Sequence, residues 1–179
     1  SQRLAITADR TFYSQSPDGG KKGLKAARSI ALLSYRTYET YATTQMEIST
    51  EKVSDFKASS YQNYQGEKLV NRFNAYSYYY LTRAMDSHNI GRKRVATEDV
   101  LKQIKAKTLV IGIPNDVLFP VHEQHFLANH IPNAQFAELN SFYGHDGFLI
   151  EIEALTQILG NFLKTTDSDK QVISLHKIA

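Results

Sequence analysis

The first half of the chain carries its apolar residues at helical spacing. Residues 1–22 are polar and contain a proline–glycine loop signal, after which apolar side chains recur every three or four positions over residues 24–41. Beyond a polar connection the same period returns over residues 61–85. This spacing places the apolar side chains on one face of each predicted helix. We therefore expect a connecting segment over residues 1–22 and an all-helical region over residues 23–91.

The pattern changes near residue 92, where strand-like and helical segments begin to alternate. The predicted elements are strands over residues 107–113 and 134–139 and helices over residues 120–130 and 147–163. The first strand is a continuous run of apolar and β-branched residues, which is typical of a parallel strand buried on both faces. Helices between the strands imply right-handed crossovers. The sequence predicts an α/β region over residues 92–164 and a loosely held polar tail over residues 165–179.

Composition narrows the class of protein. The chain has 179 residues, of which 42% are apolar, and this suits one ordinary domain with a sizeable core. It has no cysteine, which excludes disulfides, a thiolate nucleophile and cysteine-ligated metal sites. The apolar runs are far shorter than the ~18–20 residues that span a bilayer, and no signal-peptide pattern is present. We expect a cytoplasmic protein that does not enter a membrane.

Charge and tyrosine content leave two further interpretations open. The net charge is +3, and a local basic cluster within residues 92–107 would suit a phosphate or an anionic cofactor. A solvated connector and helix face is the favoured explanation of this cluster. The tyrosine-rich stretch over residues 61–80 could stack nucleic-acid bases. Its helical spacing and its lack of interleaved basic residues favour packing or a subunit interface instead, and no nucleic-acid partner is expected.

Two titratable residues follow the predicted strands. Asp116 comes three residues after the first strand, and His145 lies in the loop after the second. Loops at the carboxyl ends of parallel strands meet, so Asp116 could orient the imidazole of His145 as a general base toward a hydroxyl nucleophile. Acid before histidine is also the chain order of α/β-hydrolase triads. Spacing alone leaves an alternative, in which Asp116 caps the next helix and His145 is an ordinary loop histidine.

The nucleophile of such a triad is missing from the sequence. No serine lies in a G-x-S-x-G pattern, and serines such as Ser34 and Ser77 fall within predicted helices. A strained nucleophile elbow cannot form there. We therefore expect the serine to come from outside this chain, and we expect the two strands to be the end of a larger sheet.

A metal site is a rival interpretation of the second half. His122, His125 and His130 lie on or near one predicted helix, and His122 and His125 could share a face. A site would also need a carboxylate and a third ligand in register, and Glu123 points elsewhere. A polar helix surface is therefore favoured, and no metal is expected.

Several segments together resemble the homoserine O-acetyltransferases, which are α/β-hydrolase-fold enzymes. The segments are GLKAARSIALLSYR (23–36), YQGEKLVNRFNAYSYYYLTRAMDSH (64–88), TLVIGIPNDVLFP (108–120) and YGHDGFLIE (143–151). The resemblance covers about residues 1–164. It implies the C-terminal half of such an enzyme: an all-helical lid over residues 23–91, and then the C-terminal part of an α/β-hydrolase fold, with parallel strands and flanking helices.

The resemblance also implies roles for individual residues. Asp116 matches the acid of the triad and His145 its base. Asp146 resembles the acid that holds the amino group of homoserine, and Arg36 the arginine that pairs with its carboxylate. Helix capping by Asp146 and a surface position for Arg36 are the competing explanations. Asn74 stands where the family pattern has aspartate, and we expect it to affect lid packing rather than chemistry.

The implied reaction is a ping-pong acyl transfer from acetyl-CoA to L-homoserine in methionine biosynthesis. Acetyl-CoA acts as a co-substrate, with no bound cofactor, and the lid excludes water. The exposed tyrosine faces predict a homodimer formed through the helical lid. Three alternatives remain: a succinyl donor, serine as the acceptor, and a non-catalytic lid or scaffold fragment.

Overall fold

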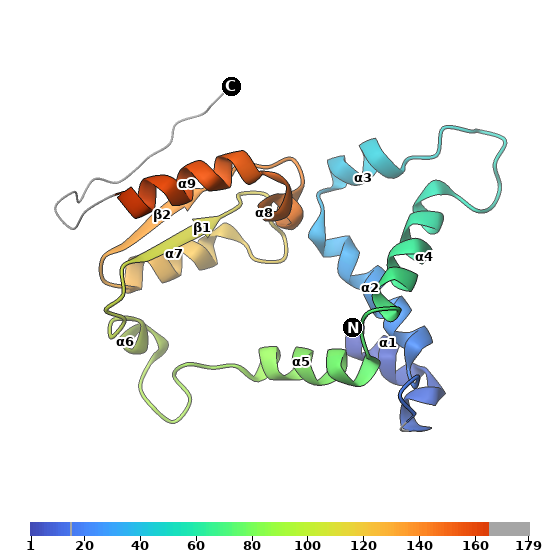
Figure 1. The fold of residues 1–179 in the computed structure, drawn as a ribbon, viewed down its shortest axis with the longest axis horizontal. Helices are drawn as coiled ribbons and strands as arrows, with labels where there is room; N and C mark the ends of the chain where they lie inside the picture. Colours follow the sequence, from blue (N-terminus) through green and yellow to red (C-terminus); the bar gives the residue numbers. More distant parts are fainter. Residues whose placement is uncertain (15, 165–179) are drawn as a thin grey trace. The chain divides into compact units, whose positions relative to one another are not determined.

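The computed structural model describes residues 1–14 and 16–164 and divides the chain into two compact units. Residues 1–34 and 38–88 form a helical unit, and residues 35–37 join the chain from Asn89 onward in an α/β unit. Figure 1 shows the elements of both units along the chain. The tail that was expected over residues 165–179 lies outside the described residues.

The helical unit contains more, and shorter, helices than the apolar period predicts. Its elements are α1 (Gln2–Ala8), η1 (Arg10–Ser14), α2 (Lys21–Tyr35), α3 (Tyr38–Gln45), α4 (Lys57–Val70) and α5 (Ala75–Ser87). The single helix expected over residues 24–41 is two helices. Between them, Arg36 and Thr37 make hydrogen bonds to Asp146 and Phe142 and belong to the α/β unit. The helix expected over residues 61–85 is also divided, between α4 and α5.

Asn74 marks the start of α5 after the break that follows α4. Its side-chain oxygen accepts hydrogen bonds from the backbone N–H groups of Tyr76 and Ser77, which caps the start of α5. Its amide nitrogen donates to the carbonyl of Pro17 at 3.0 Å. An aspartate could make the cap but not the second bond, because an ionised carboxylate only accepts hydrogen bonds. Asparagine therefore also ties α5 to the N-terminal segment.

The N-terminal segment is part of the core rather than a simple polar connection. Ile6 of α1 is fully buried, in a cluster with Leu24, Leu69 and others. The backbone of Gly23 runs so close to α1 that a Cβ there would lie 2.6 Å from Ile6 Cα. Asp9 accepts a hydrogen bond from the backbone N–H of Gly23. A hydrogen bond from the Thr11 hydroxyl is the main cause of the lowered pKa of Asp9.

Glu47 organises the connection between α3 and α4. Its carboxylate pairs with the Lys52 ammonium at 2.8 Å and accepts hydrogen bonds from the backbone N–H groups of Ser49 and Lys57. The hydrogen bond from Lys52 is the largest cause that lowers the pKa of Glu47 to about 2. Glu47 therefore anchors a stretch that has no regular structure of its own.

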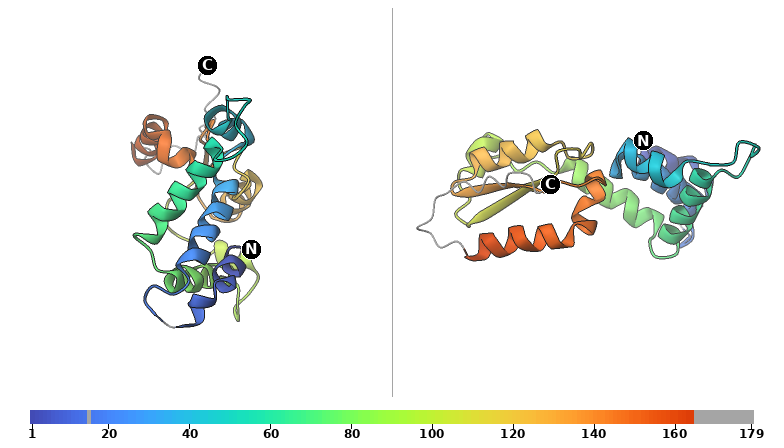
Figure 2. Two further views of the ribbon diagram at one scale, coloured as in Figure 1. Left: turned by 90° about the vertical axis from the view of Figure 1, so that its right-hand side faces the viewer. Right: turned by 90° about the horizontal axis from the view of Figure 1, so that it is seen from above.

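The α/β unit is a two-stranded parallel sheet with helices on both faces. Its elements are α6 (Thr97–Leu101), β1 (Thr108–Gly112), α7 (Val121–His130), β2 (Ala134–Glu138), η2 (Gly144–Asp146), α8 (Gly147–Ile150) and α9 (Ile152–Lys164). Thr108 pairs with Ala134, and the register continues to Gly112 opposite Glu138. Figure 2 shows α7 on one face of the sheet and α9 on the other. The strands and the parallel pairing agree with the sequence-based expectation.

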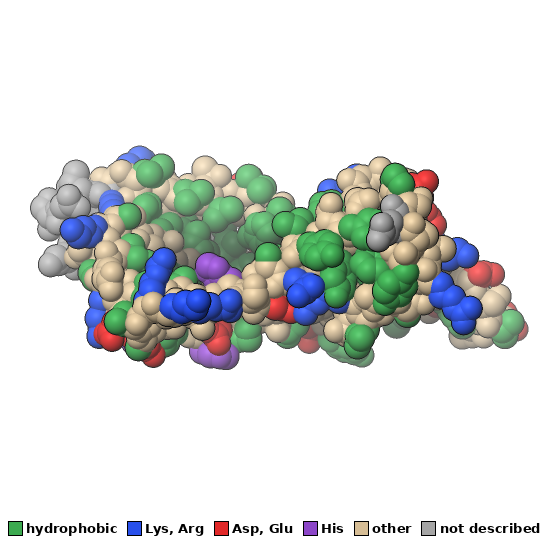
Figure 3. All heavy atoms as spheres, turned by 90° about the horizontal axis from the view of Figure 1, so that it is seen from below, with side chains coloured by type: hydrophobic (Ala, Val, Ile, Leu, Met, Phe, Trp, Pro, Cys, Tyr) green, Lys and Arg blue, Asp and Glu red, His purple; other side chains and the backbone are tan. Residues whose placement is uncertain are grey.

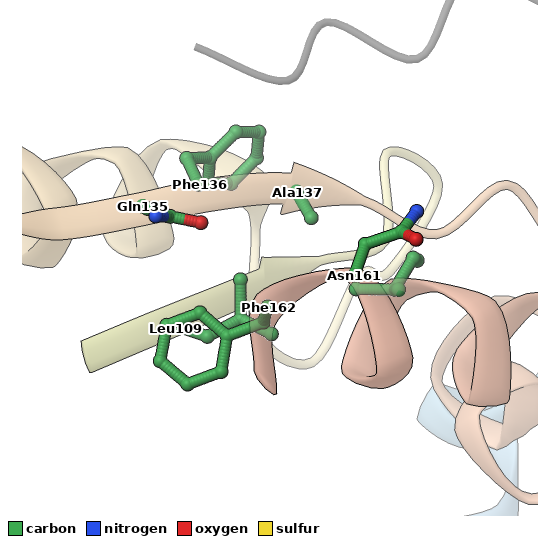
Figure 4. A pocket seen from close by; sticks show the side chains of 7 residues that line it. Leu109, Gln135, Phe136, Ala137, Asn161 and Phe162 are labelled. Carbon is green, nitrogen blue, oxygen red and sulfur yellow. The ribbon is translucent and has the colours of Figure 1, made fainter. Parts of the chain in front are cut away.

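The core of this unit lies between the sheet and α9. Ile158 of α9 packs against the strand ends at Ile113, Ala137 and Leu139. Next to this core a small gap remains, lined by Leu109 and by other side chains from the strands and α9 (Figure 4). It is largely apolar and carries no pair of titratable groups. No helix among the described residues is long and apolar enough to cross a membrane.

Candidate active site

Asp116 and His145 meet beyond the carboxyl ends of the two strands. Asp116 follows β1 and His145 lies in η2, after β2, so both loops leave the same end of the parallel sheet. The Nδ1 atom of His145 lies 2.8 Å from the Oδ2 atom of Asp116. The side chain of Asp116 is 6% exposed and that of His145 is 18% exposed. The structure therefore brings the two residues into direct contact within one unit.

The second carboxylate oxygen of Asp116 fixes its orientation. Its Oδ1 atom accepts hydrogen bonds from the backbone N–H groups of Leu118 at 2.8 Å and Phe119 at 2.9 Å. The next helix, α7, begins after Pro120 without a side-chain cap. The alternative in which Asp116 merely caps this helix is therefore wrong. Asp116 closes its own turn with one oxygen and holds His145 with the other.

His145 has the environment of a general base. Nδ1 must carry the proton when it donates to the Asp116 carboxylate, which leaves the lone pair of Nε2 available. The rings of Tyr35, Phe119 and Phe148 surround the imidazole, with centroids 5.2–5.5 Å from its own. Because these contacts are made by the faces and edges of aromatic rings, they keep the imidazole in place without a hydrogen bond to Nε2.

Arg36 and Asp146 form an ion pair beside this dyad. The Nε atom of Arg36 lies 3.0 Å from the Oδ2 atom of Asp146, and the two side chains are 22% and 17% exposed. Arg36 lies in the link between α2 and α3, so it is not a surface helix residue. Asp146 precedes α8 but makes no side-chain cap to it. Both competing explanations therefore fail, and a positive and a negative group lie next to His145.

Several polar residues around the dyad escaped the sequence analysis. Thr37 is buried, and its hydroxyl donates to the carbonyl of Phe142 at 3.0 Å. Asn115 donates to the carbonyl of Ser141 at 2.7 Å, and Ser141 in turn donates to Glu151. Short polar side chains in loops beside a predicted acid and base were the available signal. Their partners lie between 10 and 105 residues away along the chain, so the sequence did not reveal them.

Gly144 has an unusual backbone conformation directly before His145. Its φ angle is +63°, in the left-handed region that favours glycine. A Cβ there would also lie 3.2 Å from the methyl group of Thr37. His145 is the next residue in this turn. A residue with a Cβ at position 144 would therefore strain the loop that carries His145.

The histidines of α7 have structural contacts of their own. His125 packs on Phe136 with ring centroids 4.1 Å apart, and the ring of His130 contacts Phe126. His122 is largely exposed. Within residues 1–14 and 16–164 no three side chains are grouped as metal ligands would be. The contacts of His125 and His130 suit a helix that packs on the sheet.

Curated homoserine O-acetyltransferases are similar to most of the chain. That of Cyclobacterium marinum is 50% identical over 162 residues, which are 90% of this chain and 46% of the relative. That of Chloroherpeton thalassium is 44% identical over 167 residues, which are 92% of this chain and 44% of the relative. The chain thus spans about half the length of these curated relatives. No protein-family model matches the sequence.

Solved structures agree with these sequence relatives. A homoserine O-acetyltransferase from Bacillus anthracis has a TM-score of 0.80 at 21% identity, over 94% of this chain and 48% of that protein. The enzyme from Staphylococcus aureus has a TM-score of 0.67 at 27% identity, over 94% of this chain and 48% of that protein. Esterase E22 has a TM-score of 0.77 at 20% identity, over 91% and 48% of the two chains. The chain is therefore a homologue of the homoserine O-acetyltransferases over about half of their length, with the corresponding part of an α/β-hydrolase fold.

Proposed function

We propose that this chain supplies the acid and the base of a Ser-His-Asp triad in an acyltransferase that acetylates L-homoserine from acetyl-CoA. The observation that carries the proposal is the 2.8 Å contact between His145 and the buried Asp116 at the strand ends. It occurs in a chain 50% identical to a protein named homoserine O-acetyltransferase. The nucleophilic serine would come from a segment outside these residues.

The reaction would proceed in two half-reactions. His145 takes the proton of the serine hydroxyl through Nε2, and the serine oxygen attacks the thioester carbonyl of acetyl-CoA. The sulfur leaves, takes that proton from the imidazolium, and an acetyl-serine remains. His145 then deprotonates the hydroxyl of homoserine, which attacks the ester. The serine oxygen leaves and regains the proton. Asp116 keeps the imidazole in the required tautomer and stabilises its charged form throughout.

Arg36 and Asp146 would select the acceptor. Homoserine is a zwitterion, so its carboxylate suits the Arg36 guanidinium and its ammonium suits the Asp146 carboxylate. Without substrate these two groups neutralise each other at 3.0 Å. The carboxylate of a zwitterion can take the place of Asp146 beside Arg36, and its ammonium can take the place of Arg36 beside Asp146. A water molecule carries no charge and cannot take either place in the same way. This pair favours an amino-acid acceptor over the hydrolysis that an esterase of the same fold performs.

The proposal predicts that the 179-residue chain alone is inactive. The test compares it with a complete enzyme, which we define as this chain joined to the part of the Cyclobacterium marinum relative that it does not match. The chain alone should release no CoA above the buffer rate from acetyl-CoA and homoserine, because it has no serine elbow. The complete enzyme should form O-acetylhomoserine. Turnover by the chain alone, or a folded but inactive complete enzyme, would contradict the proposal.

The same assay separates the alternatives that the sequence leaves open. Succinyl-CoA in place of acetyl-CoA tests the donor, and serine in place of homoserine tests the acceptor. A non-catalytic scaffold would catalyse transfer from neither donor to either acceptor. We further propose that the enzyme serves methionine biosynthesis, since O-acetylhomoserine is an activated form of homoserine. A location in the cytoplasm is a separate part of this proposal.

We also propose that the complete enzyme forms a homodimer through the helical unit. Large side chains such as Tyr38, Tyr64, Tyr80 and Met85 of this unit are more than half exposed. Figure 3 shows apolar side chains gathered on one of its faces. Apolar surface of this kind commonly marks an interface.

Sedimentation at micromolar concentration should therefore show a dimer. Replacing Tyr38 with glutamate should shift it toward the monomer, because a charge would then be buried in the interface. Replacing Lys22, an exposed residue of α2 that is not among these side chains, with glutamate is the matched control. A monomer in the unsubstituted enzyme would mean that the rest of the protein covers these side chains.

A further inference from the structure

Ser141 is the centre of a hydrogen-bond network beside the dyad. It lies in the loop between β2 and η2, and its hydroxyl donates to the Oε1 atom of Glu151 at 2.9 Å. The same hydroxyl oxygen accepts from the backbone N–H of Tyr143 at 3.0 Å. The carbonyl of Ser141 accepts from the side chain of Asn115 at 2.7 Å.

The direction of these bonds follows from the groups themselves. A carboxylate only accepts hydrogen bonds, and a serine hydroxyl has one proton to give. That proton must point at Glu151, so the lone pairs of the Ser141 oxygen remain for the N–H of Tyr143. The chain of donors runs from Tyr143 through Ser141 to Glu151. The hydroxyl proton of Ser141 is therefore engaged with Glu151 and not with His145, and this arrangement does not suit a nucleophile.

The network joins the two ends of the segment that carries His145. Residues 141 and 151 are its two ends, and the catalytic turn η2 lies between them. Gly147, at the start of α8, approaches so closely that a Cβ there would lie 2.5 Å from the Cβ of Ser141. Glu151 itself separates α8 from α9, with φ −81° and ψ 52°, which are not helical angles. The helix expected over residues 147–163 is thus broken at the residue whose carboxylate holds the loop.

The network also reaches the acid of the dyad. Asn115 directly precedes Asp116, so its bond to Ser141 joins the loop after β1 to the loop after β2. The His145–Asp116 bond is therefore not the sole contact between these loops, which the Asn115–Ser141 bond and the packing of Phe119 on His145 also join. The Asn115–Ser141 bond contains no reacting group, and it helps to hold the two loops at their observed separation.

We propose that Ser141 and Glu151 are positioning residues that hold His145 in line with Asp116. The proposal rests on the proposed function, since it assigns how the base of that reaction is kept in place. Neither residue touches the reacting atoms. Their effect would pass through the geometry of the imidazole, and a displacement of about 1 Å at a catalytic group can cost about a hundredfold in rate.

The test compares Glu151→Ala with Glu151→Gln in the complete enzyme. Alanine removes the acceptor, whereas glutamine keeps an acceptor oxygen at the same reach. Glu151→Ala should lower kcat by about ten- to a hundredfold, with the KM for homoserine within about twofold, because Arg36 and Asp146 are untouched. Glu151→Gln should restore most of the rate. Glu153→Ala, which removes an exposed carboxylate two residues further on, is the matched control and should be neutral.

A spectroscopic measurement without substrate completes the test. The proton between His145 Nδ1 and Asp116 should give a downfield NMR signal that Glu151→Ala broadens or loses and Glu151→Gln keeps. Ser141→Ala, which removes a single oxygen, should act as Glu151→Ala does and is the second variant if that one does not fold. An unchanged signal and kcat in both alanine variants would overturn the proposal. Failure of the unsubstituted enzyme to acetylate homoserine would instead count against the proposed function, since the NMR result does not need turnover.

Discussion

His145→Ala in the complete enzyme is expected to lower kcat by at least about 10³-fold. In the proposed reaction the imidazole takes the proton from the nucleophile and later from homoserine, and no other described base lies against Asp116. Base and nucleophile act as a unit, so the loss of either removes most of the catalysis that both provide. The measurement is steady-state CoA release with homoserine saturating.

Asp116→Asn is expected to be similarly severe. The new amide nitrogen can donate to His145 Nδ1, which forces the imidazole proton onto Nε2, where the lone pair is needed. The turn that Asp116 makes with Leu118 and Phe119 can persist through the amide oxygen, so the protein should still fold. His122→Ala, at an exposed histidine of α7, is the matched control. Near-normal rates for either dyad variant would show that Asp116 and His145 are not the acid and base.

Arg36→Ala is expected to reduce kcat/KM for homoserine sharply and to leave acylation nearly unchanged. Arg36 would bind the acceptor carboxylate, and its loss leaves Asp146 without the partner it has at 3.0 Å. Removing one partner of a buried charged contact typically costs about 2–5 kcal/mol, or between about thirtyfold and a few thousandfold. Acetyl-CoA has no part in this contact. A single burst of CoA release without homoserine should therefore keep its rate.

Two comparisons make the Arg36 experiment specific. Arg94→Ala, at an exposed arginine outside the site, should change neither step. An amino alcohol that lacks the carboxylate should be a poor acceptor for the unsubstituted enzyme. In Arg36→Ala, the difference in kcat/KM between homoserine and this amino alcohol should become smaller. If the burst slows as much as turnover, Arg36 supports the structure or CoA binding, and it has no place in the acceptor site.

The helical unit illustrates how far the apolar period determines a fold. Apolar spacing correctly located helices within residues 24–41 and 61–85, because one face of each must be buried. The apolar period did not predict the break between α2 and α3. Arg36 lies at this break, and its partner Asp146 is 110 residues away, so local spacing carries no information about their contact. The period also missed α1, where a single buried residue, Ile6, joins a core built by other helices.

In the α/β unit the sequence by itself determined the two strands, their parallel order and the placement of Asp116 and His145 in adjacent loops. These follow from local composition and from the rule that parallel strands end at the same edge of a sheet. Only the tertiary structure decided that Arg36 pairs with Asp146 and that Ser141 joins Asn115 to Glu151. The reason is that loop conformation depends on hydrogen bonds between residues distant in the chain, and each of these polar side chains had several equally possible partners in the sequence.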